Sequence, residues 1–311
     1  MNTAPQGQLP RTELDRLIEE YLESLEVERN SSPLTLRNYR HYLNRFSSWF
    51  KKNSPASKLS SLNLTTLKKY RIFLSRFTAP NHTPLSRSTQ AYHVIALRSF
   101  LRWLIKNDYR TLPPEKIDLP KTESRSLKFL TTAQVERLLA QPKISEPREL
   151  RDKAILETLF STGLRVSEIV SLNRDQIDLK RREFGVIGKG RRPRVVFLSS
   201  RAGKWLERYL NWRTDEEKAL FIRLGARPAR LTARSVQRIV KKYVQKARLP
   251  VDATTHTLRH SFATDLLMAG ADLRSVQEML GHKNISTTQI YTHVTNKQLR
   301  QVHETFHGRG N

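Results

Sequence analysis

Hydrophobic positions in the first third of the chain recur with the period of an α-helix. In four stretches, apolar side chains return every three or four residues, which places them on one helical face. Ser32 and Pro33 precede the second stretch as a typical cap and first-turn residue, and short connections predict a small all-α bundle. The apolar positions are Leu14, Leu17, Tyr21 and Leu25; Leu36, Tyr39, Leu43, Phe46 and Phe50; Leu67, Tyr70, Leu74 and Phe77; and Val94, Leu97, Leu101 and Leu104.

This helical pattern stops between Arg110 and Ser126. The segment TLPPEKIDLPKTES contains three prolines and no helical periodicity, so we expect an extended linker there. A length of 311 residues also suits two domains of roughly 100 to 200 residues each. The predicted division is a helical domain over residues 1–112, a linker over 113–126 and a second domain over 127–311.

The second domain is predicted to be mainly helical with one small hairpin. Thr131 or Thr132 caps a first helix, residues 148–161 form a second that Gly163 closes, and residues 165–173 form a third. Two short β-like runs, EFGVI and RVVFL, flank GKGRRP and predict a hairpin with a basic tip. From Ala202 onward the pattern is helical almost to the end. The predicted fold class is therefore mainly α with a small β-hairpin, in two domains.

Charge is the feature of composition that narrows the function. Lys and Arg number 56 against 29 Asp and Glu, a formal net charge of +27, and the commonest partner for such an excess is nucleic acid. A membrane is the competing polyanion, but the chain lacks both an apolar stretch of about 18 residues and a signal-like start. We therefore expect a cytoplasmic, DNA-binding protein with no membrane partner. The absence of cysteine excludes disulfides, thiol catalysis and thiolate metal sites.

The positive charge is concentrated in the predicted bundle. No Asp or Glu occurs from Arg29 through Asn107, although Lys and Arg are frequent there. Within this region Arg98, Arg102 and Lys106 recur at every fourth position of the predicted fourth helix, a stripe that could follow a phosphate backbone. The alternative is an ordinary solvated face, but such faces normally mix both signs of charge.

Four local patterns of the second domain carry candidate chemistry. They are STGLRVSE with Arg165, VIGKGRRPR with Lys189, HTLRH with His256 and Arg259, and LGHKNISTTQIYTHV with His282 and Tyr291. A phosphodiester under attack gains charge on its non-bridging oxygens, and fixed guanidinium groups such as Arg165 and Arg259 would stabilise that charge. Most arginines in so basic a chain would instead make surface salt bridges or nonspecific phosphate contacts.

His256 and Arg259 are three residues apart, so they share one face of the helix predicted for HTLRHSFATDLL. One can accept a proton while the other holds the phosphate. His260 lies four residues after His256, a spacing that would also allow the two histidines to bind a metal ion. Two histidines at that spacing are a weak signal, and no Glu lies between them as in metalloproteases. We expect neither a metal nor another cofactor.

Tyr291 is the candidate nucleophile. A tyrosine has a reference pKa of about 10, so it needs a nearby base or positive field to attack at neutral pH, and His256 with the two arginines would supply both. The other tyrosines lie mostly on apolar helical stripes, where packing explains them.

Lys189, between two glycines at the hairpin tip, could protonate the departing 5′ oxygen. A P-loop is the rival interpretation of GKG, but its full motif is absent. Arg191, Arg192 and Arg194 are expected to contact the DNA backbone.

Together, and in this order, these motifs resemble the tyrosine recombinase (phage integrase-like) family, in its Xer branch. The resemblance is strongest at GLRVSEIVSL, VIGKG, HTLRHSFATDLLMAGADLRSVQEMLGH and STTQIYTHV, and it spans the whole chain. It implies that Arg165, Lys189, His256, Arg259 and His282 assemble around the scissile phosphate while Tyr291 forms a 3′-phosphotyrosyl bond. Glu168 is expected to orient a neighbouring residue rather than to react.

The resemblance also implies partners and a role. Four identical or paired protomers on two DNA sites would exchange strands through a Holliday junction without ATP, with a septal DNA translocase as a candidate activator. The expected role is the resolution of chromosome dimers at cell division. The alternatives are a phage- or transposon-type integrase, a type IB topoisomerase with related chemistry, and an architectural DNA-binding protein without catalysis.

Overall fold

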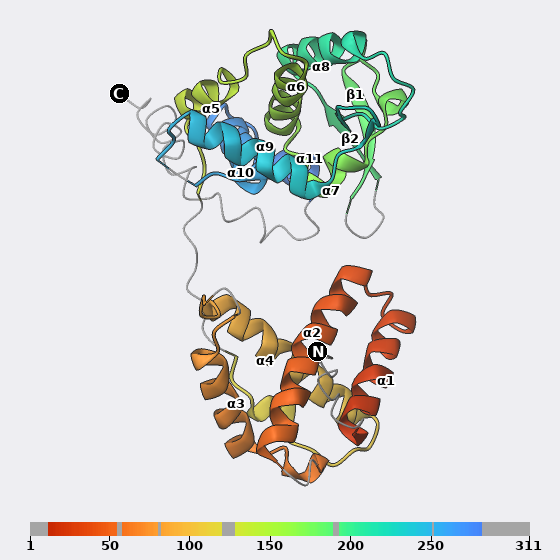
Figure 1. The fold of residues 1–311 in the computed structure, drawn as a ribbon, viewed down its shortest axis with the longest axis vertical. Coiled ribbons are helices and arrows are strands. Elements are labelled where there is room, and N and C mark those ends of the chain that lie inside the picture. Colours follow the sequence, from red (N-terminus) through yellow and green to blue (C-terminus); the bar gives the residue numbers. More distant parts are fainter. Residues whose placement is uncertain are drawn as a thin grey trace, which may run out of the picture. The chain divides into compact units, whose positions relative to one another are not determined.

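The computed structural model describes residues 12–54, 58–79, 82–119, 128–188, 193–250 and 252–281. The chain divides into two compact units, Met1–Ser124 and Arg125–Asn311. Both are built mainly from helices, and the strands form two small antiparallel sheets (Figure 1). The predicted fold class is confirmed.

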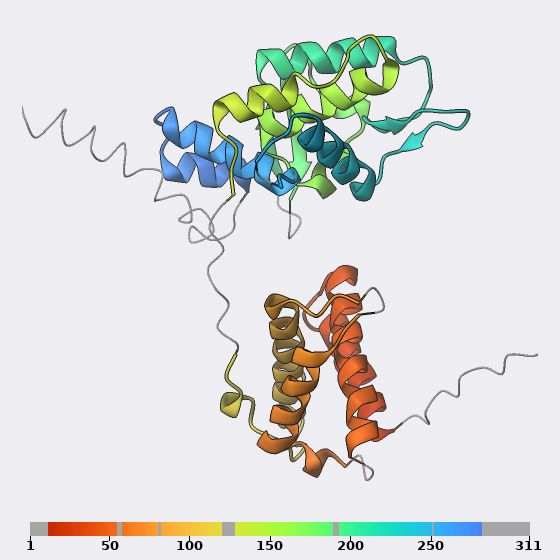
Figure 2. The same ribbon diagram turned by 60° about the vertical axis from the view of Figure 1, so that its left-hand side comes forward.

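The first unit contains the four predicted helices, with α2 packed against α1, α3 and α4 (Figures 1 and 2). Ser32 caps α2 by accepting a hydrogen bond from the backbone nitrogen of Thr35, and Pro33 takes the first helical position, as the sequence predicted. Aromatic side chains from all four helices fill the core, among them Tyr21, Phe46, Tyr70 and Phe100. The helices are α1 (Glu13–Val27), α2 (Pro33–Asn53), α3 (Leu64–Arg76) and α4 (Arg87–Lys106), with a 3₁₀ turn η1 (Leu59–Ser61) before α3.

The segment predicted as a linker starts as part of this unit. Residues Pro114–Lys116 form a 3₁₀ turn, η2, that packs on α4, and Ile117 is buried in the same core. The sequence did not predict this packing, because the prolines interrupt helical periodicity without preventing burial. Residues 120–126 of the predicted linker lie outside the described residues.

The second unit is organised around α6, which packs against α8 and α10 (Figure 2). Helix α6 ends at Gly163, whose φ of 59° lies in the left-handed region that favours glycine. A Cβ at that position would lie 2.4 Å from the ring of Phe262, so both conformation and space require glycine. The helices of this unit are α5 (Thr132–Leu139), α6 (Pro147–Thr162), α7 (Val166–Ser171), α8 (Ser200–Trp212), α9 (Ala233–Lys246), α10 (Thr255–Met268) and α11 (Leu273–Leu280), with a 3₁₀ turn η3 (Arg174–Gln176).

The predicted hairpin is present as β1 (Glu183–Ile187) paired with β2 (Pro193–Phe197), with Gly185 opposite Val195. A second pair, β3 (Ile222–Arg223) and β4 (Ala229–Arg230), was not predicted, so the expectation of continuous helix after Ala202 is wrong for this stretch. Strands of two residues are too short to show the alternation that identifies a strand in a sequence. None of the helices in the described ranges is long and apolar enough to cross a membrane.

Candidate active site

Three helices of the second unit bring two of the predicted site residues, Arg165 and Arg259, close to the same segment of backbone. Arg165 is the residue before α7, Arg259 lies in the first half of α10, and both donate hydrogen bonds to backbone oxygens at the end of α11. Arg165 Nη2 lies 3.4 Å from the oxygen of Gly281, and Arg259 Nη2 lies 2.6 Å from that of Leu280. The structure therefore places two of the predicted phosphate-binding arginines beside the segment that precedes His282 in the sequence.

The two arginines have different surroundings. Arg259 is only 4% exposed, and its Nη1 also donates to the oxygen of Gly163 at 2.6 Å, so two carbonyl groups fix its guanidinium. The side chain of Arg165 is 25% exposed. Arg259 is thus held rigidly, and Arg165 is partly accessible. Together the two guanidinium groups are suited to bind one phosphate through two contacts.

Glu168 holds Arg165 in place. Its carboxylate accepts one hydrogen bond from Arg165 Nη1 and another from the Arg165 backbone nitrogen, both at 2.9 Å. Burial alone would raise the pKa of Glu168, but hydrogen bonds from Arg194 and the Arg165 backbone, together with both positive charges, lower it to about 2. Glu168 is therefore ionised at neutral pH and contacts Arg165, and its expected role of orienting a neighbouring residue stays a prediction.

His256 lies at the start of α10 with its side chain exposed to solvent. Partial desolvation, with the positive charges of Arg259 and Arg165, lowers the pKa of His256 below its ordinary value. The imidazole is therefore neutral at pH 7 and able to accept a proton.

His260, one turn further on, is half-buried, and desolvation with the charges of His256 and Arg259 lowers its pKa to about 4. Within the described ranges, no three His, Asp or Glu side chains form a group that could hold a metal ion.

Several predicted site residues lie outside the described residues. They are Lys189, Arg191, Arg192, His282 and Tyr291. Their roles stay predictions. The described chain on either side reaches Gly188 after β1, Pro193 at the start of β2 and Gly281 after α11.

Arg194 is more buried than its predicted contact with the DNA backbone would require. It was grouped with Arg191 and Arg192 as a contact to the DNA backbone, yet its side chain is only 10% exposed and forms an ion pair with Glu168. The alternation of β2 carries the signal that sequence reasoning missed, because Arg194 shares its face with the buried Val196. Its hydrogen bonds leave the DNA contact without support from the structure.

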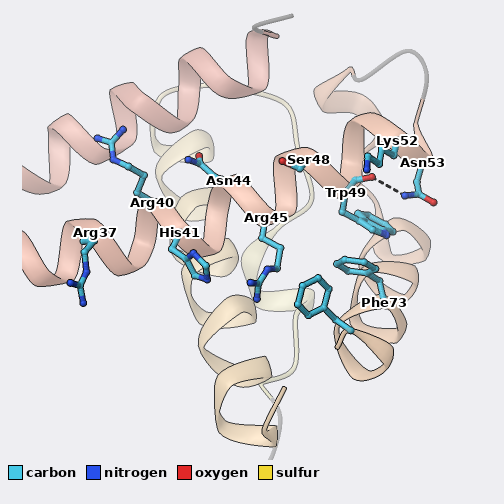
Figure 3. Close-up of a pocket in the computed structure, with 11 residues that line it drawn as sticks. Arg37, Arg40, His41, Asn44, Arg45, Ser48, Trp49, Lys52, Asn53 and Phe73 are labelled. Carbon is cyan, nitrogen blue, oxygen red and sulfur yellow. Dashed lines mark hydrogen bonds between the residues drawn. The ribbon is translucent and has the colours of Figure 1, made fainter. Parts of the chain in front are cut away.

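The first unit carries a separate basic groove of about 800 Å³ along α2 (Figure 3). Arg37, Arg40, Arg45 and Lys52 line it, and the rings of Trp49 and Phe73 lie at one end. Arg40 also pairs with Glu19 of α1. None of the described residues that line the groove is acidic. Sequence reasoning recognised the acid-free region but did not single out this face of α2.

Arg45 is held in the groove by contacts with two aromatic rings. Its Nη1 lies 3.1 Å from Nε2 of His93, and its guanidinium stacks 4.4 Å from the centre of the Phe77 ring. Burial lowers the pKa of His93 to about 4, so the ring is neutral and can accept from Arg45 while Nδ1 donates to the oxygen of Thr89.

The predicted stripe on α4 is partly accessible. Arg102 and Lys106 are exposed, whereas Arg98 is half-buried. The Nε atom of Arg98 has no hydrogen-bond partner among the described residues. Two of the three residues can therefore reach a ligand without rearrangement, and a contact between this stripe and DNA stays a prediction.

Comparison with known proteins identifies the family of the chain. A family model described as the phage integrase family matches residues 128–298, and one described as the phage integrase N-terminal SAM-like domain matches residues 18–108. Tyrosine recombinase XerC of Oceanobacillus iheyensis is 39% identical over 306 residues, which cover 96% of this chain and 98% of that protein. Tyrosine recombinase XerD of Lacticaseibacillus casei is 36% identical over 301 residues, which cover 94% and 99%.

A solved structure supports the fold. The crystal structure of the XerH site-specific recombinase bound to palindromic difH substrate matches with a TM-score of 0.70 and 24% identity, over 92% of this chain and 82% of that one. The chain belongs to the phage integrase family of tyrosine recombinases, which are DNA strand-exchange enzymes. Its XerC and XerD relatives place it in the Xer branch, and the resemblance seen in the sequence is confirmed.

Proposed function

We propose that this protein cuts and rejoins duplex DNA at a specific site through Tyr291, and that it resolves chromosome dimers in the cytoplasm before cell division. The observation that carries the proposal is the convergence of Arg165 and Arg259 on the backbone at Leu280 and Gly281. Two guanidinium groups at one point can bind a phosphate and stabilise the charge of its transition state. The next residues in the sequence lead through His282 to Tyr291.

In the proposed reaction, neutral His256 takes the phenolic proton as Tyr291 attacks phosphorus. A tyrosyl–phosphate bond forms at the 3′ end, the bond to the 5′ oxygen breaks, and Lys189 protonates that oxygen. Arg165, Arg259 and His282 hold the phosphate. Attack by a 5′ hydroxyl from the partner strand reverses these steps, so rejoining requires no nucleotide cofactor because the phosphotyrosyl ester conserves the bond energy.

The basic groove on α2 and the α4 stripe of Arg98, Arg102 and Lys106 are proposed to bind DNA phosphates outside the reaction centre. Arg191 and Arg192 are proposed to do so near the hairpin tip. The XerH neighbour is described as bound to palindromic difH substrate. The observation that supports double-stranded DNA as the partner here is the basic groove, in which none of the described lining residues is acidic.

Assembly of four protomers on two sites is proposed to use an apolar groove of about 600 Å³ on the second unit. Phe160, Phe262 and Leu266 line it together with Val195 and Phe197, which are 53% and 55% exposed. Leu299, Val302 and Phe306, outside the described residues, recur at helical spacing near the end of the sequence. The proposal is that this stripe occupies the groove of a neighbouring protomer and links protomers in a cycle.

Two experiments test the role. DNA fragments from the source genome that the protein selects would identify its site, and a palindromic site near the replication terminus supports chromosome resolution. A plasmid with two copies of that site should be resolved into two circles, whereas a plasmid without the site should stay supercoiled. Relaxation of the site-free plasmid would instead support a topoisomerase, and a selected site at the end of a mobile element would support an integrase. Dependence on a septal translocase would appear as stimulation when one is added.

A further inference from the structure

Arg194 connects three elements of the second unit through one guanidinium group. Nη1 and Nη2 donate to the two oxygens of Glu168 at 3.0 and 2.9 Å, and Nε donates to the backbone oxygen of Met279 in α11 at 3.2 Å. A Cβ built on Gly281 would lie only 3.1 Å from the Arg194 side chain, so α11 ends directly against it. All three guanidinium nitrogens thus face protein groups.

Glu168 is saturated because Arg194 is present. One carboxylate oxygen accepts from Arg165 Nη1 and Arg194 Nη1, and the other accepts from the Arg165 backbone nitrogen and Arg194 Nη2. With two donors on each oxygen, the carboxylate is fixed in orientation and contacts the Arg165 guanidinium through Nη1 alone. Without Arg194, Glu168 would be free to turn and to take both Arg165 Nη groups in a bidentate pair.

The charges of Arg165, Glu168 and Arg194 also indicate that Arg194 keeps Arg165 available for the phosphate. Glu168 contributes one negative charge and the two arginines contribute two positive charges, which leaves one net positive charge beside the proposed phosphate site. Removal of Arg194 would leave Arg165 neutralised by a buried carboxylate. The clamp would then keep the charge of Arg259 but lose most of that of Arg165, and it would stabilise the added charge of a phosphorane less well.

We infer that Arg194 is a positioning residue for catalysis, not a contact to the DNA backbone: it neutralises and orients Glu168 so that Arg165 keeps its charge and one face for the scissile phosphate. This inference rests on the proposed function. It also links β2, which follows Lys189 in the sequence, to Arg165 through Glu168. The predicted role of Arg194 as a phosphate contact is therefore replaced.

The test compares cleavage rate with DNA affinity. For Arg194→Ala, the first-order rate of covalent adduct formation at saturating protein should fall about 10- to 100-fold, the range typical of groups that orient a ligand. DNA affinity and its salt dependence should stay at the wild-type values. If Arg194 contacts a phosphate instead, affinity falls and the slope of log K against log salt drops by about one. That result, or a wild-type cleavage rate, overturns the inference.

Two further variants make the test specific. If Arg194 acts through Arg165, the same change should cost much less in an Arg165→Lys background, whereas full additivity contradicts the inference. Arg194→Lys retains the charge without the two parallel donors and should also cleave slowly, which decides the question if Arg194→Ala does not fold.

Arg213→Lys is the matched control. Arg213 is a buried arginine paired with Asp215 and with the backbone oxygens of residues 217, 219 and 220. Its substitution should lower the thermal midpoint and leave the rate per folded molecule unchanged. Absence of any adduct with the wild-type protein would instead contradict the proposed function itself.

Discussion

Arg259 donates a hydrogen bond of 2.6 Å to the backbone oxygen of Leu280, two residues before His282. This bond joins the helix that carries His256 to the segment leading toward Tyr291, and a second bond from Arg259 to Gly163 adds the end of α6. The proposed phosphate site is therefore fixed by backbone contacts that ordinary side-chain substitutions elsewhere leave in place. Its chemistry can be tested one group at a time.

The first prediction concerns pH. Since His256 must be neutral to take the phenolic proton, the rate of adduct formation should fall as pH drops through the pKa of His256, which lies below its ordinary value of 6.5. The rate should be constant between pH 7 and pH 8. Rapid-quench measurement of the adduct, with circular dichroism at each pH, gives the profile.

His260 provides the control for that profile. Burial lowers the pKa of His260 to about 4. Since the inflection is assigned to His256, His260→Asn should leave it in place, whereas His256→Asn should remove it and slow the reaction by about 10²- to 10⁴-fold. An inflection near pH 4 in the wild type would assign the proton acceptor to His260 and contradict the account.

The second prediction concerns Lys189 as the general acid. Lys189→Ala should cleave ordinary DNA slowly but recover on a substrate with a 5′-bridging phosphorothiolate, because a thiolate leaving group needs little protonation. Arg191→Ala, which alters a neighbouring cation, should show no such preference for the sulfur substrate. Equal impairment of Lys189→Ala on both substrates would remove Lys189 from this role.

The third prediction concerns the basic surface of the first unit. For about six phosphate contacts, the slope of log K against log salt should be roughly −5. Arg37→Ala and Lys52→Ala, both exposed in the groove of Figure 3, should each reduce the slope by about one. Arg16→Ala, which removes an exposed arginine paired with Glu20 on α1, should leave it unchanged. A slope near zero would contradict the charge argument.

The fourth prediction concerns assembly. A chain ending after Val294 should bind DNA but fail to form the four-protomer complex and to recombine, because the stripe of Leu299, Val302 and Phe306 is absent. Phe197→Glu should give the same defect from the other side, since it places a charge in the apolar groove. Sedimentation of protein–DNA complexes measures assembly. A truncated chain that assembles and recombines at the full rate would exclude this link.

Sequence reasoning identified most of the fold because the relevant signals are local. Helical periodicity and the caps at Ser32 and Gly163 depend on neighbours within a few residues. The packing of Ile117 and the pairing of Arg194 with Glu168 depend on residues distant in the sequence, and Glu168 is 26 residues from Arg194. The spacing of Arg165 and Arg259 in the sequence could not show that they share one site. Only the family resemblance predicted this.

The measurement that tests the central claim most directly is covalent adduct formation on a nicked suicide substrate carrying the selected site. In excess EDTA and without ATP, the wild-type protein should become linked to the 3′ phosphate through Tyr291, as peptide mapping of the adduct would show. Tyr291→Phe should bind the same DNA with unchanged affinity and form no adduct. An adduct that persists in Tyr291→Phe, or one that forms only when Mg²⁺ or Zn²⁺ is restored, would contradict the proposed chemistry.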